Sequence, residues 1–184
     1  MRKKYISLLF LAGVTAASQT AFAADGTITF SGNVTAQTCT INGNGNGNGS
    51  GSKDFTVTLP VVSASALTSA GQTAGRTPFN IALTACTPSS GNVHAYFEPG
   101  PTVDMATGNL KLTGSGATNV QIGLLNEDFT VVKVGAADAS QNSKAVPISA
   151  AGAATLPFYA QYVATGAATA GVANSNVLYS LVYQ

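Results

Sequence analysis

Apolar residues alternate with polar or small ones in short runs along most of the chain, and helical periodicity is nearly absent. Side chains alternate with a period of two along an extended strand. The alternating runs lie at residues 27–34, 55–59, 79–83, 93–97, 109–112, 120–125, 129–134, 146–148, 155–163 and 176–184. With turn signals between them, these runs predict about ten short strands and an all-β sandwich in one domain, with at most a single helical turn near residues 64–70.

The last run is the most informative. Val177, Tyr179, Leu181 and Tyr183 share one face of an extended strand at the C-terminal end. Leu178 and Val182 make its second face apolar as well. Because an end of a chain is normally polar and frayed unless it is tied into a sheet, we expect this segment to be a sheet member. What covers its apolar face is then the central question about function.

The first 23 residues have the pattern of a secretory signal peptide. Arg2, Lys3 and Lys4 precede an apolar run at residues 6–17, and Ala21-Phe22-Ala23 forms a small-x-small cleavage site. A membrane anchor is the alternative, but the run is shorter than the roughly 18 to 20 residues that cross a bilayer. We therefore expect cleavage before Ala24 and a soluble exported protein.

Charge argues against a nucleic-acid partner. The chain has eight Lys and Arg and seven Asp and Glu, and three of the basic residues lie in the signal peptide. Five basic against seven acidic residues leave residues 24–184 with a net charge of about −2. No basic patch is available to neutralise phosphates. The low charge favours sheets covered by one another or by neighbouring molecules.

Two cysteines remain, Cys39 and Cys86. In an exported protein they are expected to form a disulfide. Two free buried thiols are the less favoured alternative. A metal site is less favoured still, because two cysteines and the distant His94 make no ligand cluster. The sequence indicates no cofactor.

Catalytic motifs are not found. His94 is the single histidine and lies in a predicted strand, where we expect it to face solvent or a neighbour. The acidic pair Glu127-Asp128 falls in a predicted turn, and no nucleophile elbow, phosphate loop or zinc motif is present. The Asn-Gly tract at residues 42–49 predicts a flexible loop without the carboxylates that hard cations need. An enzyme is therefore not expected.

The N-terminal run after the signal peptide mirrors the C-terminal one. Ile28, Phe30, Gly32 and Val34 share one face, and the polar residues 35–38 join this run to the rest of the chain. A strand with one apolar face and free backbone groups attracts a partner strand. The segment either lies in its own domain or reaches into another.

Together these features resemble the type 1 fimbrial (chaperone–usher) pilin family, and a major subunit in particular. The matching pieces are Gly26-x-Ile28-x-Phe30-x-Gly32-x-Val34, Cys39-Thr40-Ile41, Val57-Thr58-Leu59-Pro60, Thr77-Pro78-Phe79-x-Ile81-x-Leu83 leading to Cys86, Gly171 fourteenth from the terminus, and Tyr183 as the penultimate residue. Each piece alone is weak, but their combination in this order covers essentially all of residues 24–184.

The resemblance implies an incomplete immunoglobulin-like sandwich that lacks its final strand and is completed by donor-strand exchange. Residues 24–38 would be the N-terminal extension and residues 39–184 the pilin domain. The donor positions would be Ile28, Phe30, Gly32 and Val34. The acceptor and chaperone-binding strand would include Gly171, Val177, Tyr179, Leu181, Tyr183 and the carboxylate of Gln184.

The resemblance also implies partners and a location. The partners would be identical or related pilin subunits, a periplasmic chaperone, an outer-membrane usher and, through the fibre, a host-surface receptor. The chain would pass through the periplasm to a fimbrium on the bacterial surface and support cell adhesion. The alternative is a minor adaptor or an adhesive subunit that binds a host glycan, although the chain has no Trp and no room for a separate lectin domain.

Overall fold

The computed structural model describes residues 29, 31–32, 34, 36–44 and 52–184. Contacts divide the chain into a unit of residues 1–34 and a unit of residues 35–184. The first unit is described only at Thr29, Ser31, Gly32 and Val34, and the signal peptide lies outside the described residues. The second unit holds all the strands that the structure describes.

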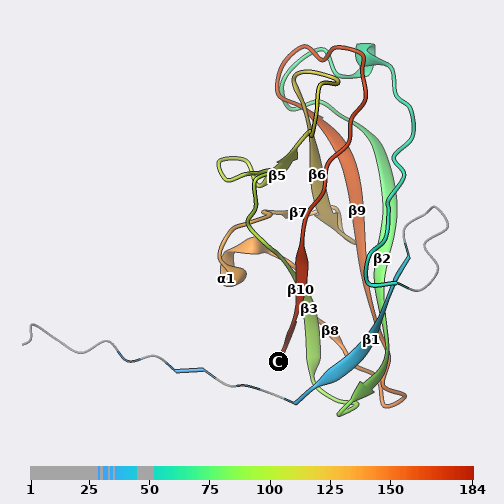
Figure 1. Cartoon of the computed structure of the whole chain (residues 1–184), viewed down its shortest axis with the longest axis vertical. Coiled ribbons are helices and arrows are strands. Elements are labelled where there is room, and N and C mark those ends of the chain that lie inside the picture. The colour runs from blue at the N-terminus through green and yellow to red at the C-terminus, as the bar shows by residue number, and fades with distance from the viewer. Residues whose placement is uncertain (1–28, 30, 33, 35, 45–51) are drawn as a thin grey trace, which may run out of the picture. The chain divides into compact units, whose positions relative to one another are not determined.

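This second unit is built from two antiparallel sheets (Figure 1). The larger sheet runs in the order β1 (Thr38–Asn44), β2 (Thr73–Thr87), β9 (Ala154–Ala164), β6 (Val120–Asn126), β5 (Asn109–Lys111) and β4 (Val103–Asp104), and β7 (Val131–Val132) also pairs with β6. The smaller sheet runs in the order β10 (Tyr179–Tyr183), β3 (Asn92–Phe97) and β8 (Val146–Pro147). The described residues also form two single helical turns, η1 (Ala64–Ala66) and α1 (Asp138–Gln141).

The core lies between these sheets and follows the predicted alternation. Ile81 of β2, Leu156 of β9 and Val93 of β3 are fully buried in one cluster. Phe97 and Phe158 meet edge to face across the layers, with ring centroids 5.2 Å apart. Burial of such alternating apolar residues is the main force that holds two sheets together. The expected all-β sandwich is confirmed.

The strand β1 was not expected, because three of its residues belong to the Asn-Gly tract. It pairs with β2 through Ile41 opposite Leu83 and Gly43 opposite Ile81. Gly43 is buried, and a Cβ there would overlap the ring of Phe55. The prediction of a loop was therefore wrong at residues 42–44, and residues 45–49 lie outside the described residues.

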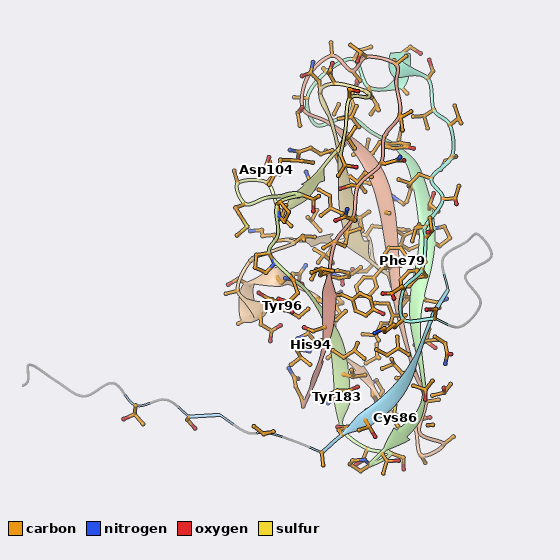
Figure 2. All side chains as sticks on the ribbon, viewed as in Figure 1. Phe79, Cys86, His94, Tyr96, Asp104 and Tyr183 are labelled. Atoms are coloured by element: carbon orange, nitrogen blue, oxygen red, sulfur yellow. A yellow bond between two sulfur atoms is a disulfide. The ribbon has the colours of Figure 1, made fainter. Side chains whose placement is uncertain are left out.

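The predicted disulfide is present between Cys39 of β1 and Cys86 of β2. It fixes the start of β1 against the end of β2, where Thr38 lies opposite Thr87. Figure 2 places Cys86 near one end of the sandwich. This bond explains how a Gly-rich segment of weak strand propensity is held in the sheet.

Other predicted runs form shorter ladders or none. Residues 55–59 alternate as expected but belong to neither sheet. The run at 129–134 is a strand only in β7, and Phe129 at its start adopts a left-handed conformation with φ 64°. The terminal run forms a ladder only over β10. The helical turn near residues 64–70 is found as η1, whereas α1 is too short to leave a periodic signal.

Candidate functional site: an apolar groove beside the C-terminal strand

Strand β10 is an edge strand. It pairs with β3 through Tyr179 opposite Phe97 and Leu181 opposite Ala95, and the smaller sheet ends there. Among the described residues, no strand pairs with its other edge. An edge of this kind presents unpaired N–H and C=O groups to any strand that approaches.

The same one-sided bonding continues upstream of β10. The backbone N–H groups of Ala117, Thr113 and Glu98 donate to the carbonyl oxygens of Val172, Asn174 and Leu178, at 3.0, 2.8 and 2.8 Å. Glu98 follows β3, whereas Thr113 and Ala117 belong to the connection between β5 and β6. The three accepting carbonyls are at even-numbered positions of the long segment that Figure 1 draws in red, so they lie along one of its edges. Residues 172–183 thus form one continuous wall that is bonded along one edge.

Residues 53–62 form the opposite wall. Phe55, Val57 and Leu59 are half-buried against the core, whereas the residues between them are exposed. The wall begins where Gly43 of β1 donates a 2.9 Å backbone hydrogen bond to Ser52. It therefore has an alternating inward face, as a strand does, without being part of a sheet.

Two adjoining cavities of about 580 and 710 Å³ lie between these walls. Both are lined by Thr56, Val57, Leu59, Ile122 and Ser175, so together they form one groove. The floor of the first cavity consists of core residues from both sheets, namely Phe79, Ile81, Phe97, Leu110, Ile122, Leu124 and Ala160. The floor of the groove is therefore part of the hydrophobic core.

The groove is almost free of charge. Among the described residues, Lys53 and Asp54 are the only charged ones in its lining, and they lie in the first cavity. Burial raises the pKa of the Tyr162 hydroxyl, and burial together with the nearby Asp54 carboxylate raises the pKa of Tyr179. Both phenols are therefore neutral at physiological pH. Such a surface suits an apolar occupant rather than an ionic ligand.

Most predicted acceptor residues lie at this groove. Val177, Tyr179 and Leu181 line the first cavity, and Gly171 lines the second. Tyr183 packs against the core beyond the cavities, at the far end of β10 in Figure 2. Gln184 comes directly after it.

Close packing of two backbone segments explains why residue 171 is a glycine. A Cβ at Gly171 would lie 2.6 Å from the carbonyl carbon of Gly116, so the two backbones cross without room for a side chain. This crossing holds the upper part of the C-terminal wall against residues 113–118.

Gln184 continues the pairing of β10 with β3. Its N–H donates a 2.8 Å hydrogen bond to the carbonyl of Asn92, and its carboxylate accepts one of 2.9 Å from the N–H of Asn92. The neighbouring Gly91 leaves room for this carboxylate, because a Cβ there would lie 2.6 Å from the Gln184 oxygen. The terminal carboxylate is thus held at the end of the edge strand.

The second apolar face of the terminal strand is less buried than the first. Leu178 has 75% of its surface exposed, and Val182 is half-buried. Leu178 lines the rim of the first cavity. Its exposure next to the open edge of the wall extends the apolar surface of the groove.

The predicted donor residues are placed only in part. Ile28 and Phe30 lie outside the described residues. Gly32 and Val34 belong to the N-terminal unit, which is described by itself. Their role as donor positions therefore stays a prediction. What sequence reasoning missed is the wall at residues 53–62, whose alternation was interpreted as a strand within a sheet.

His94 is not at the groove. It is 5% exposed on β3, and its Nε2 lies 2.7 Å from Oδ1 of Asp138 in α1. It lines neither cavity, and no nucleophile contacts it among the described residues. Asp128 pairs with Lys144 at the surface, next to the exposed Glu127. These contacts join neighbouring elements and build no catalytic site.

The part of the chain that the structure describes contains no group of three or more His, Cys, Asp or Glu side chains placed to hold a metal ion. It contains no helix that is long and apolar enough to span a bilayer.

Residues 59–184 match the family model FimA, described as type-1 fimbrial protein, A. This chain belongs to the type-1 fimbrial protein family. It is 49% identical to the major fimbrial subunit SMF-1 of Stenotrophomonas maltophilia, over 91% of this chain and 98% of that protein. It is 47% identical to the F17 fimbrial protein of Escherichia coli, over 95% and 97% of the two chains.

The P pilus rod subunit PapA shares the fold of this fimbrial protein. The two structures align with a TM-score of 0.54 at 19% identity, over 71% of this chain and 93% of that one. Membership of the family makes the protein a structural component of a cell-surface fimbrium, beside other pilin subunits, and not an enzyme. The resemblance seen in the sequence is confirmed.

Proposed function

We propose that this fimbrial protein polymerises by inserting its N-terminal segment, residues 24–38, as a strand into the groove of a neighbouring subunit in a chaperone–usher fimbria. The fibre that results supports cell adhesion. The observation that carries the proposal is the unpaired edge of β10 beside a groove that is lined by residues of the hydrophobic core. A sandwich of this kind is complete only when another strand occupies the gap.

The groove beside β10 and the N-terminal segment are both suited to strand addition. A strand in the groove gains main-chain hydrogen bonds from the open edge and places alternate side chains in the cavities. Ile28, Phe30, Gly32 and Val34 supply four positions on one face. At about 3.3 Å per residue they span roughly 20 Å, which is shorter than the wall formed by residues 172–183. The wall is therefore long enough to lie along all four positions.

The same exposed surface explains a need for a chaperone. An open apolar groove beside an unpaired edge strand is a site of aggregation. In our proposal the signal peptide of residues 1–23 directs export, and a periplasmic chaperone fills the groove until an outer-membrane usher brings in the next subunit. Basic residues of the chaperone would contact the Gln184 carboxylate, one oxygen of which is already held by Asn92.

The test is to delete residues 24–35 and to follow filament formation by negative-stain microscopy of cells that also make the chaperone and the usher. We expect the truncated subunit to reach the periplasm and to form no filaments. Normal filaments from this chain would refute the proposal.

A point variant sharpens the test. Phe30→Asp places a carboxylate on the face that enters the groove, where an unpaired charge is strongly disfavoured. Ser31→Asp is the matched control, because its side chain points to the opposite face. We expect filaments from Ser31→Asp and none from Phe30→Asp. Equal filament yields from the two variants would contradict the assignment of the donor face.

A further inference from the structure

The side chain of Tyr179 crosses the groove from β10 to the opposite wall. Its hydroxyl donates a 2.8 Å hydrogen bond to the backbone carbonyl of Lys53. Its ring meets the ring of Phe55 edge-on, with centroids 6.2 Å apart. Phe55 in turn contacts Phe79 on the floor, at 6.1 Å between centroids. Tyr179 thereby links both walls and the floor in one series of contacts.

This link matters because no β-ladder of the described residues joins residues 53–62 to β10. The two walls are separate segments that face each other across an apolar gap. A bond from one to the other sets how far apart they stand when the groove has no occupant.

An inserted strand needs the space between the walls that the Tyr179 side chain now crosses. Strands in a sheet lie about 4.8 Å apart, so a strand that bonds to both walls needs them roughly 9.6 Å apart. Tyr179 also lines the first cavity, into which side chains of the strand would enter. A strand that enters this gap meets both the ring and the hydrogen bond.

Building on the proposed function, we propose that Tyr179 is a gating residue for donor-strand entry. Its bond to Lys53 holds the walls together in the unfilled subunit and must open before a donor strand takes its place. A neutral hydrogen bond suits this role because its net contribution to stability is small, so that it can be replaced by hydrogen bonds to water or to another strand. The bond keeps the Tyr179 side chain across the unfilled groove without preventing assembly.

The test compares three forms of the mature chain, residues 24–184: the unchanged protein, Tyr179→Phe and Tyr96→Phe. Tyr179→Phe keeps the ring and removes the hydroxyl. Tyr96 is the matched control, because it lies on β3 opposite Ser180 and lines neither cavity. A fluorescent peptide with the sequence of residues 24–38 is mixed with freshly refolded monomer, and the second-order association rate is measured by anisotropy.

We expect Tyr179→Phe to bind the peptide about 2 to 12 times faster than the unchanged protein, the factor that corresponds to one net hydrogen bond. Tyr96→Phe should bind at the unchanged rate. Tyr179→Phe should also lower the Tm of the unfilled subunit while leaving the Tm of the peptide-filled subunit unchanged. A purely structural hydroxyl would lower both.

The outcomes separate the two proposals. If all three forms bind at one rate, or if Tyr179→Phe binds more slowly, the gating role is wrong and strand insertion stands. If none of the forms binds the peptide, strand insertion itself is wrong, and the gating role is lost with it.

Discussion

Gly171 gives the sharpest test of how the C-terminal wall is held in place. Its backbone passes Gly116 so closely that an added Cβ would lie 2.6 Å from the carbonyl carbon of Gly116. The 3.0 Å hydrogen bond from the N–H of Ala117 to the carbonyl of Val172 stabilises this crossing of the two backbones. Gly171→Ala therefore pushes one main chain against another, and neither can yield as a flexible side chain would.

The expected cost comes from this geometry. Overpacking by a methyl group typically costs about 1 to 3 kcal/mol. For a domain of this size each kcal/mol lowers the Tm by roughly 2 to 4 °C, so Gly171→Ala should melt roughly 2 to 12 °C lower. Because Gly171 and Ala117 both line the second cavity, the same displacement should also weaken binding of the peptide of residues 24–38.

The assay is thermal unfolding of the mature chain followed by circular dichroism. Gly100→Ala is the control, because a Cβ at that position meets nothing within 4 Å. Its effect should stay within about 0.5 kcal/mol, as for other surface substitutions. If Gly171→Ala and Gly100→Ala melt at the same temperature, the close backbone crossing does not hold the wall, and the reasoning fails.

Two further predictions concern the disulfide and a surface ion pair. Cys39 and Cys86 are separated by 47 residues, so replacing both with Ala should lower the free energy of unfolding by about 4 kcal/mol, measured in urea. A loss below about 1 kcal/mol would contradict the chain-entropy argument. The Lys144 ammonium, followed by Thr130, lowers the pKa of Asp128 from 3.8 to about 2. The ionised Asp128 carboxylate therefore contributes to the stability of the fold above pH 3.8, and this contribution is lost as the pH falls towards 2. The Tm values of the unchanged protein and of Asp128→Asn should converge over that range. A constant difference between them would refute this.

The alternation of apolar and polar residues along the chain correctly predicted which side chains of the strands face the core. Phe79, Ile81 and Leu83 are buried as expected, and Val177, Tyr179 and Leu181 face the core. This succeeds because the side-chain period of an extended strand is a local property of the backbone. The pairing of Cys39 with Cys86 was predictable for a different reason, since it depends on export into an oxidising compartment.

Pairing partners were not predictable in the same way. Residues 55–59 have a clear strand pattern and no ladder, whereas residues 42–44 have a poor pattern and lie in β1. Whether a strand joins a sheet depends on which distant segment lies beside it. Residues 42–44 join the sheet because β2 lies beside them and the disulfide holds β1 against β2. Propensity is a weak guide where such tertiary contacts override it.

The sequence by itself determined the sandwich class, the inward residues of most strands and the family, because these depend on local periodicity and on short motifs. Only the tertiary structure decided that residues 53–62 and β10 stand apart as two walls, with Tyr179 reaching across between them. The physical reason is that a gap between segments more than one hundred residues apart depends on where every other strand packs. No local pattern carries that information.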